Sequence, residues 1–299
     1  MNSYIASKEK SNNIVFLLLK QVRIKQWTKN LLVFAAILFS IEIATVEMVI
    51  RSLVGFLLFC FISGCVYILN DYADRHADRE HPEKRHRPMA SGALNPQVAL
   101  FFGAFLFLIS LFTAFYLNIL FGIILIFYFI INVAYSFKLK HVVIVDIMVI
   151  AAGFVLRAIG GGVVIGVPFT PWFLLCTLLL ALFLAISKRR HELYLLQNNM
   201  GAHRKVLEFY SPDLLNQFNS IVTTATIITY SLFTFTSGRT IHLMWTIPFV
   251  IYGIFRYLYL IHMEDKGGKP EKVLVEDRHI LITVILYAIT VVTVLIIFD

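Results

Sequence analysis

Long apolar runs separated by short polar segments dominate the pattern of the chain. A helix needs about 20 residues to cross the hydrocarbon core of a bilayer. Asn95-Pro96 is a typical helix start for the third run, whereas Glu42 and Glu47 shorten the apolar core of the first. We predict nine membrane spans, at about 30–46, 52–69, 97–117, 119–137, 142–165, 171–187, 217–237, 243–262 and 279–298.

Composition supports a membrane protein. Of the 299 residues, 59% are hydrophobic and only 15% are charged, and the mean hydropathy is +0.80. A soluble domain is about half apolar and about a quarter charged, so this chain cannot hide its apolar surface in one water-soluble core. Cys60, Cys65 and Cys176 lie in apolar runs without metal-type spacing, which favours buried small side chains over a metal site.

Positive charge is distributed unevenly between the two sides of the predicted bundle. If the loops alternate, one side collects the N-terminus and the segments 70–96, 138–141, 188–216 and 263–278, with 22 of the 26 Lys and Arg residues. Such an excess is typical of cytoplasmic loops. Topology therefore explains the net charge of +8 without a nucleic-acid partner. We predict a basic cytoplasmic segment at 1–29 and a single transmembrane catalytic domain at 30–299.

Acidic residues gather after the second span. If its helix continues past the membrane, Asn70, Asp74 and Asp78 repeat at i, i+4 and i+8 and share one stripe, with Asp71 beside it. Stacked carboxylates repel one another, and a divalent cation would reverse the sign of that interaction. Carboxylate oxygens and substrate phosphates are the usual ligands of Mg²⁺. We predict a metal site at Asn70, Asp74 and Asp78, with a solvated acidic helix end as the alternative.

A basic cluster follows the acidic stripe at Lys84, Arg85 and Arg87. Arginine suits bidentate contacts with phosphate, and lysine neutralises phosphate as a point charge. Acidic and basic groups this close together suit a single Mg-diphosphate, so we predict that the cluster binds substrate. Positive-inside anchoring together with contact with lipid headgroups is the alternative.

The fifth span contains two charged residues, Asp146 near its cytoplasmic end and Arg157 well within the hydrocarbon. They return to the same helix face within about 20°, but the rise of about 16 Å between them is too long for an ion pair. A charge at this depth faces the bundle interior or a wet cavity. Asp146 is a candidate for the site, and Arg157 has either a structural role or a role in the pocket.

Four strings together resemble a known family. The acidic stripe resembles the first aspartate-rich motif of the UbiA-type intramembrane prenyltransferase superfamily. The longer string NDYADRHADREHPEKRHRPMASG at 70–92 is more similar to one branch, the decaprenyl-phosphate phosphoribosyltransferases. So are KQWTKN at 25–30, GFVLRAIGG at 153–161 and SKRRHEL at 187–193. The resemblance extends from about residue 20 to the C-terminus.

With the predicted spans, this resemblance implies an all-α, UbiA-like bundle of about nine transmembrane helices with a central cavity open to the cytoplasm, in a bacterial inner (cytoplasmic) membrane. It implies transfer of 5-phosphoribose from phosphoribosyl pyrophosphate to a polyprenyl phosphate such as decaprenyl phosphate, with Mg²⁺ or Mn²⁺ and release of pyrophosphate. Asp71, Asp74 and Asp78 would be catalytic.

The resemblance also implies further substrate contacts. Lys29 belongs to one of the matching strings. The superfamily has a tyrosine-lysine motif in the loop after the fourth span, where this chain has Tyr135, Lys138 and Lys140. One of the two lysines is expected to contact diphosphate, and the unusual spacing leaves the choice open.

The chain departs from the prenyltransferase pattern after the sixth span. Those enzymes have a second aspartate-rich motif there, whereas this chain has Lys188, Arg189 and Arg190 with the single acid Glu192. This pattern speaks against a second metal and favours a cationic pocket for a phosphate without metal, with topogenic charge as the alternative.

Two other functions stay open from the sequence. One is an aromatic polyprenyltransferase with a prenyl diphosphate donor. The other is a transporter of an anionic solute, although the sequence has no visible inverted repeat or broken helix. The lipid chain length, the formation of a homo-oligomer and the role of the loop 263–278 stay open as well.

Overall fold

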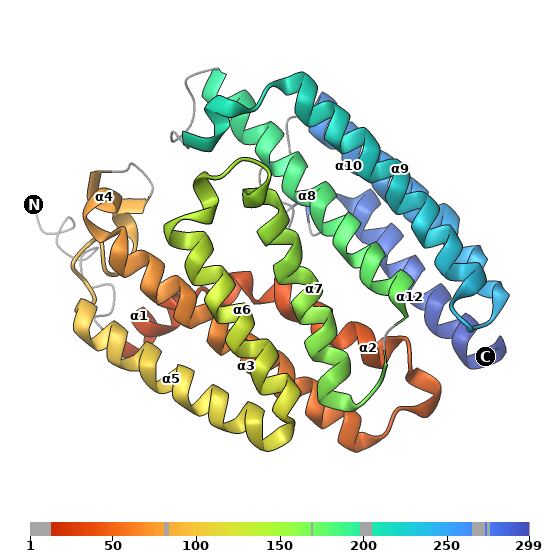
Figure 1. Ribbon diagram of the computed structural model, residues 1–299, viewed down its shortest axis with the longest axis horizontal. Helices are drawn as coiled ribbons and strands as arrows, with labels where there is room; N and C mark the ends of the chain where they lie inside the picture. The colour runs from red at the N-terminus through yellow and green to blue at the C-terminus, as the bar shows by residue number, and fades with distance from the viewer. Residues whose placement is uncertain are drawn as a thin grey trace, which may run out of the picture. The chain divides into compact units, whose positions relative to one another are not determined.

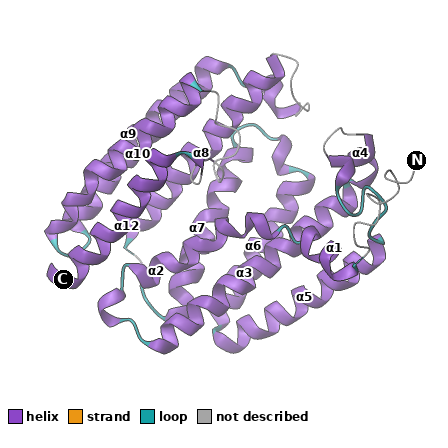
Figure 2. Ribbon diagram, turned by 180° about the vertical axis from the view of Figure 1, so that it is seen from behind, coloured by secondary structure: helices purple, strands orange, loops and turns teal. Residues whose placement is uncertain are grey.

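The computed structural model describes residues 13–80, 84–168, 170–197, 205–264, 273 and 276–298, and this part of the chain contains helices but no strand (Figures 1 and 2). Eight of the described helical segments are long and apolar enough to cross a bilayer, and they correspond to the second to ninth predicted spans. They are α3 (Val46–Ala73), α5 (Pro96–Leu117), α6 (Ile119–Phe137), α7 (Val145–Ile165), α8 (Pro171–Gln197), α9 (Pro212–Thr236), α10 (Ile247–Met263, extended by the 3₁₀ helix η6, Ile241–Thr246) and α12 (Arg278–Phe298).

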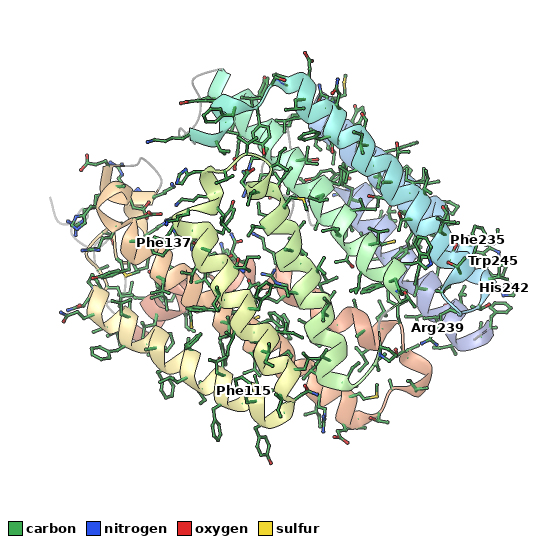
Figure 3. The ribbon with its side chains drawn as sticks, viewed as in Figure 1. Phe115, Phe137, Phe235, Arg239, His242 and Trp245 are labelled. Carbon is green, nitrogen blue, oxygen red and sulfur yellow. The ribbon has the colours of Figure 1, made fainter. Side chains whose placement is uncertain are left out.

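These helices expose apolar surface, as expected of helices in contact with lipid. In an apolar 18-residue stretch of α5, just 28% is buried inside the protein. Phe101 and Phe112 of this helix are 78% and 76% exposed. Aromatic side chains also stand near helix ends, as Phe115 and Phe137 do on α5 and α6 (Figure 3). Tryptophan and tyrosine are the aromatic residues enriched at bilayer interfaces, and Trp245 of η6 and Tyr116 near the end of α5 are 53% and 85% exposed. The protein is therefore an integral membrane protein.

Segment 30–46 differs from the predicted first span. It contains the end of the 3₁₀ helix η1 (Ile24–Phe34), the single turn α2 (Ala35–Leu38) and the short 3₁₀ helix η2 (Ile41–Ile43). None of these elements is long enough to cross a bilayer. Packing explains part of the irregularity, because α2 contacts α7 and a Cβ atom on Gly161 of α7 would lie 2.2 Å from the Val33 carbonyl oxygen.

Contacts within the chain define two compact units. The first contains the residues up to Asn30 and Leu57–Phe137. It includes α1 (Ile14–Gln21), most of α3, α4 (Arg75–Glu80), the 3₁₀ helix η3 (Lys84–His86), and the α5–α6 hairpin. Val22, Cys65, Ile68, Met89, Leu94, Ala99 and Leu106 form one buried core of this unit. The Asn95 side chain accepts a hydrogen bond from the Gln97 N–H and caps α5, as the sequence predicts.

The second unit contains Leu31–Phe56 and Lys138–Asp299. Within it, α8 packs against α7 and α9, and α10 packs against α12. The short 3₁₀ helix η5 (Lys205–Phe209) contacts both α8 and the turn η4 (Leu139–His141). These contacts bring the end of α8 together with the segments that precede α7 and α9. Lys8, Lys10 and most of the loop 263–278 lie outside the described residues.

Candidate functional site

The acidic stripe of the first unit is present at the end of α3. The N–H of Asp74 donates to the carbonyl of Asn70 over 2.9 Å, and the N–H of Asp78 donates to the carbonyl of Asp74 over 2.8 Å. Helical hydrogen bonding thus continues through the turn between α3 and α4. The three predicted metal ligands therefore occupy successive turns, as their spacing predicts.

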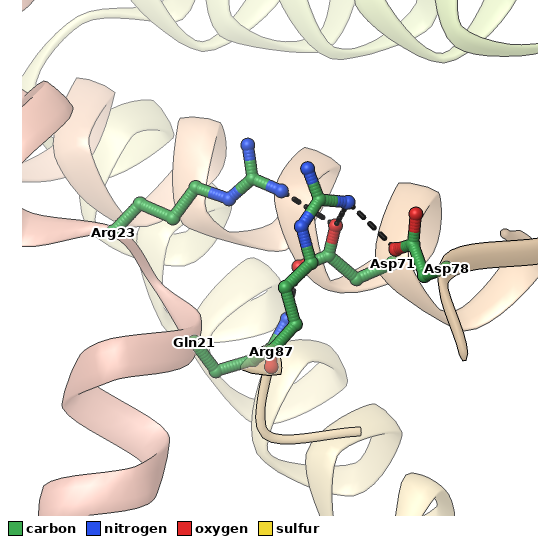
Figure 4. Close-up of polar contacts among 5 residues, drawn as sticks. All are labelled: Gln21, Arg23, Asp71, Asp78 and Arg87. Atoms are coloured by element: carbon green, nitrogen blue, oxygen red, sulfur yellow. Dashed lines mark hydrogen bonds and ion pairs between the residues drawn. The ribbon is translucent and has the colours of Figure 1, made fainter. Parts of the chain in front are cut away.

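Two carboxylates of this region are buried and share an arginine (Figure 4). Asp71 and Asp78 are each 3% exposed. Arg87 Nη1 lies 2.9 Å from Asp71 Oδ1 and 2.7 Å from Asp78 Oδ2. Asp71 also accepts hydrogen bonds from Arg23 over 2.6 Å and from Gln21 over 2.8 Å. The result is a charge-assisted network in which Asp71 receives three side-chain donors.

The loop after η3 places Arg87 against these carboxylates. Its Met89 and Leu94 side chains are buried in the same core as Ile68. The N–H of Leu94 donates to the Pro88 carbonyl over 3.0 Å, and Arg79 Nε donates to the Ala90 carbonyl over 3.1 Å. Because the apolar anchors follow Arg87 directly, they fix the backbone from which its guanidinium reaches inward.

The predicted basic cluster is split by this arrangement. Arg87 points to the acidic pair, whereas Arg85 is exposed and its Nε lies 3.4 Å from His86 Nε2. Lys84 is half-buried. The other two candidates of the first unit are also half-buried: Lys29 donates to Gln26 Oε1 over 2.6 Å, and Tyr135 lies in the last turn of α6.

The donor set of the acidic stripe suits a hard cation, although its carboxylates do not form a closed cage. Among the described residues, no three His, Cys, Asp or Glu side chains are grouped so as to hold a metal ion. Mg²⁺ is usually bound by one or two carboxylates together with water and substrate phosphates. Among the stripe residues, Asp78 already pairs with the positively charged Arg87 guanidinium, as does the neighbouring Asp71. The metal ligands Asn70, Asp74 and Asp78 stay a prediction.

A second charged cluster lies in the second unit, at the ends of α7 and α8. Asp146 is fully buried, and its Oδ2 lies 2.6 Å from Nε of Arg189, which is 1% exposed. Arg189 also donates to Glu192 over 2.5 Å, and the Tyr210 hydroxyl donates to Asp146 Oδ1 over 2.7 Å. Arg189 and Asp146 thus form a buried ion pair with hydrogen bonds on both sides.

The remaining basic candidates of the second unit lie nearer to solvent. Arg190 is half-buried and donates to Asn216 Oδ1 over 2.8 Å, so it joins α8 to α9. Lys188 on α8 and Lys140 on η4 are half-buried, and Lys138 is exposed. These four cations are therefore more accessible than Arg189.

Arg157 lies in the middle of α7, eleven residues after Asp146. It is 7% exposed, its Nη1 donates to the Gly153 carbonyl over 2.8 Å, and its guanidinium stands 5.3 Å from the centre of the Phe154 ring. Its own helix thus provides part of the solvation that a charge needs at this depth.

A small cavity of the second unit has other lining residues. Its volume is about 50 Å³, and Ala36, Phe39, Val167, Phe173 and Arg239 are among the residues that line it. None of the predicted site residues lines this cavity. It therefore does not help to locate the predicted chemistry.

Four contributors to the two clusters were missed by the sequence analysis. Gln21 and Arg23 lie in a segment whose charges are explained by topology, and Arg23 has a positive φ of 54° that no local pattern indicates. Tyr210 and Asn216 precede or begin an apolar helix and have no motif of their own. The only sequence signal for Tyr210 was its place just before the Ser211-Pro212 start of a helix.

Known proteins resemble this chain over most of its length. The chain is 36% identical over 284 residues to the decaprenyl-phosphate phosphoribosyltransferase of Mycolicibacterium smegmatis, which covers 89% of this chain and 88% of that one. It is 33% identical to the enzyme of the same name from Corynebacterium glutamicum, over 91% of this chain and 84% of that one.

Solved structures share the fold. A UbiA homolog from Archaeoglobus fulgidus bound to GPP and Mg²⁺ matches with a TM-score of 0.71 and 20% identity, over 93% of this chain and 99% of that chain. A digeranylgeranylglyceryl phosphate synthase matches with a TM-score of 0.69 and 19% identity. Residues 30–276 match the UbiA prenyltransferase family. The chain therefore belongs to the UbiA prenyltransferase family.

Proposed function

We propose that this protein transfers 5-phosphoribose from phosphoribosyl pyrophosphate to a polyprenyl phosphate such as decaprenyl phosphate. The observation that carries the proposal is the similarity, at 33–36% identity over about nine-tenths of this chain, to enzymes named decaprenyl-phosphate phosphoribosyltransferase. The charge pattern agrees, because the end of α8 carries three cations and one acid rather than an aspartate-rich motif.

The acidic stripe would bind the donor through Mg²⁺, with Mn²⁺ as a substitute. Asn70, Asp74 and Asp78 would hold the ion, which when bound would neutralise charge on the departing pyrophosphate. Asp71 already receives three donors, so we assign it the task of orienting Arg23 and Arg87. Arg87 contacts Asp78, and a diphosphate would compete for the same guanidinium.

The chemical step needs little from the protein beyond positioning and charge. The bond between ribose C1 and the pyrophosphate oxygen breaks, and an oxygen of the lipid phosphate bonds to C1 from the opposite side. Pyrophosphate leaves with the electron pair, and the configuration at C1 inverts. The lipid phosphate is already anionic, so no strong general base is required. Lys188 and Arg190 would bind a phosphate that carries no metal, and Lys138 or Lys140 would contact the diphosphate.

The proposed reaction takes place on the cytoplasmic side of a bacterial inner membrane. The basis is the positive-inside distribution, with 22 of 26 Lys and Arg residues on one side. A single cysteine at the exposed position 85, made as Arg85→Cys in a variant whose Cys60, Cys65 and Cys176 are replaced by serine, tests this orientation. It should resist a membrane-impermeant thiol reagent in intact cells and react in inverted vesicles.

The decisive experiment for the function is incubation of the purified protein with labelled phosphoribosyl pyrophosphate, decaprenyl phosphate and Mg²⁺. Label should move into the lipid phase, and a chelator should stop the transfer. Asp78→Asn should lower the rate at least about 100-fold, the scale for loss of a main electrostatic stabiliser. Glu47→Gln is the matched control, because the Glu47 side chain is 70% exposed and pairs only with Arg51 among the described residues.

Arg190 distinguishes the proposal from an aromatic prenyltransferase. Loss of a charge-assisted hydrogen bond corresponds to about 1.5–3 kcal/mol, or roughly 10- to 150-fold in affinity. Arg190→Glu should therefore raise the KM of one phosphorylated substrate by that factor. Label that stays in water, together with turnover of a prenyl diphosphate and an aromatic acceptor, would refute the phosphoribosyl assignment and leave the fold unchanged.

A further inference from the structure

The Tyr210 hydroxyl joins two segments that are far apart in sequence. Tyr210 lies between η5 and α9 and is 5% exposed. Its hydroxyl donates to Asp146 Oδ1 over 2.7 Å and accepts from the backbone N–H of Ile144, also over 2.7 Å. Both hydrogen-bonding functions of this one oxygen are therefore used, and both partners lie at the start of α7.

The Ile144 backbone is in a conformation that isoleucine rarely adopts. Its φ is +67° and its ψ is −45°, at the N-cap of α7. A positive φ in a β-branched residue is a genuine outlier and persists only when the surroundings hold it. The Ile144 side chain is 47% exposed, so burial of that side chain does not supply the restraint. A γ-turn hydrogen bond from the Val145 N–H to the Val143 carbonyl over 2.8 Å closes the turn itself. The hydrogen bond from the Ile144 N–H to the Tyr210 hydroxyl ties that turn to the segment before α9.

The turn at Ile144 lies between the two groups of cations that we propose to bind phosphate. On one side, η4, with Lys140 in it and Lys138 at its N-cap, ends three residues before Ile144. On the other side, Asp146 binds Arg189, which lies between Lys188 and Arg190 on α8. Contacts of η5 with η4 and α8 bring these segments into one neighbourhood within the second unit.

We propose that Tyr210 is a positioning residue for the transfer reaction, in that its hydroxyl clamps the strained Ile144 turn to the Asp146–Arg189 ion pair. The clamp positions Lys138 and Lys140 on one side and Lys188 and Arg190 of α8 on the other. Tyr210 itself contacts no substrate. This inference rests on the proposed function for its kinetic consequence, but the clamp can be measured without turnover.

The protonation of Tyr210 is consistent with this role. Burial raises the pKa of the Tyr210 hydroxyl, and its hydrogen bond to the Asp146 carboxylate raises that pKa further. The hydroxyl therefore keeps its proton across the physiological range and stays a donor to Asp146.

The test removes only the hydroxyl, with Tyr210→Phe in the full-length protein. We expect the KM of at least one phosphorylated substrate to rise about 10- to 100-fold, because a hydrogen bond to a charged group is lost, while kcat changes less than about 3-fold. Tyr116→Phe is the matched control, because Tyr116 is 85% exposed. All rates are compared well below each variant's own unfolding temperature.

A rescue variant separates positioning from general damage. Glycine adopts a positive φ without strain. Ile144→Gly in the Tyr210→Phe background should therefore lower the raised KM most of the way back to the wild-type value. A KM of Tyr210→Phe within about 2-fold of wild type would overturn the proposal. So would a raised KM that does not fall when Ile144→Gly is added.

Hydrogen exchange tests the clamp independently of the reaction. The Ile144 amide should exchange at least about 10-fold faster in Tyr210→Phe than in wild type and in Tyr116→Phe. If the wild-type protein does not transfer phosphoribose, the proposed function fails, and this exchange measurement still decides the clamp: unchanged protection of Ile144 would refute it.

Discussion

Arg87 offers a direct test of how the acidic pair is held. Arg87→Leu removes the contacts of 2.9 Å to Asp71 and 2.7 Å to Asp78. Asp71 keeps its hydrogen bonds from Gln21 and Arg23. Asp78 is 3% exposed and loses the ion pair that the described structure provides. The free-energy cost should therefore come mainly from Asp78.

The magnitude follows from burial. Removal of one partner from a buried ion pair costs about 3–5 kcal/mol. The Arg87 side chain is 25% exposed, so water already screens part of the interaction, and we take the lower end, about 3 kcal/mol. By the scaling for domains of 150–250 residues, this corresponds to a fall in unfolding temperature of roughly 6–12 °C. Adding Asp78→Asn to Arg87→Leu should restore about half of this fall in unfolding temperature, because the Asp78 charge is then no longer buried without its partner.

Thermal unfolding in detergent can be followed with a thiol-reactive dye. Cys60 and Cys65 are buried in the first unit and become reactive when it unfolds, and Cys176→Ser removes the thiol of the second unit. Arg85→Leu is the matched control, because Arg85 is exposed and two residues from Arg87, and it should shift the free energy of unfolding by less than about 0.5 kcal/mol. Equal unfolding temperatures for Arg87→Leu and Arg85→Leu would refute the reasoning.

Three further predictions concern the second unit. Gly161→Ala should lower the unfolding temperature by several degrees or prevent folding, since the new Cβ would lie 2.2 Å from the Val33 carbonyl oxygen; a wild-type elution profile and unfolding temperature would contradict this. Arg157→Leu should reduce stability or turnover although it adds hydrophobicity, because the guanidinium is 7% exposed and bonded within α7; unchanged values of both would show that the side chain merely reaches the interface. The hydrogen bond from Arg256 lowers the pKa of Asp277, so this pair stabilises the fold above about pH 4, the ordinary range of the group, and less as the pH falls further. The difference in unfolding temperature between wild type and Asp277→Asn should therefore shrink from pH 6 to pH 3, and a constant difference would exclude the pair as its source.

The membrane spans could be predicted from the sequence because they depend on local properties. A run of about 20 apolar residues has no stable alternative to a helix in lipid, and the second to ninth predicted spans are long helices in the structure. The start of α5 at Asn95-Pro96 is confirmed for the same reason, since a cap is a contact within one turn. The stripe at Asn70, Asp74 and Asp78 is also local, being set by helical spacing.

The partners of charged residues are not local, and only the tertiary structure decided them. From spacing alone, Arg85 and Arg87 are equivalent, but the buried anchors after Arg87 turn it inward and leave Arg85 exposed. Likewise, Arg189 and Arg190 are adjacent in sequence, yet they are about 100° apart around α8. One is buried against Asp146 of α7 and the other binds Asn216 of α9.

The segment 30–46 shows the same division. Its composition predicts a span, but its actual path depends on a close approach to α7 that a single absent side chain, at Gly161, makes feasible. Tyr210 contacts Ile144 and Asp146 across more than sixty residues of chain. The apolar runs of the sequence indicate which segments enter the membrane, because the free energy of transfer to lipid depends on each segment separately. Which polar groups meet there depends on how the helices pack, and that is a property of the whole fold.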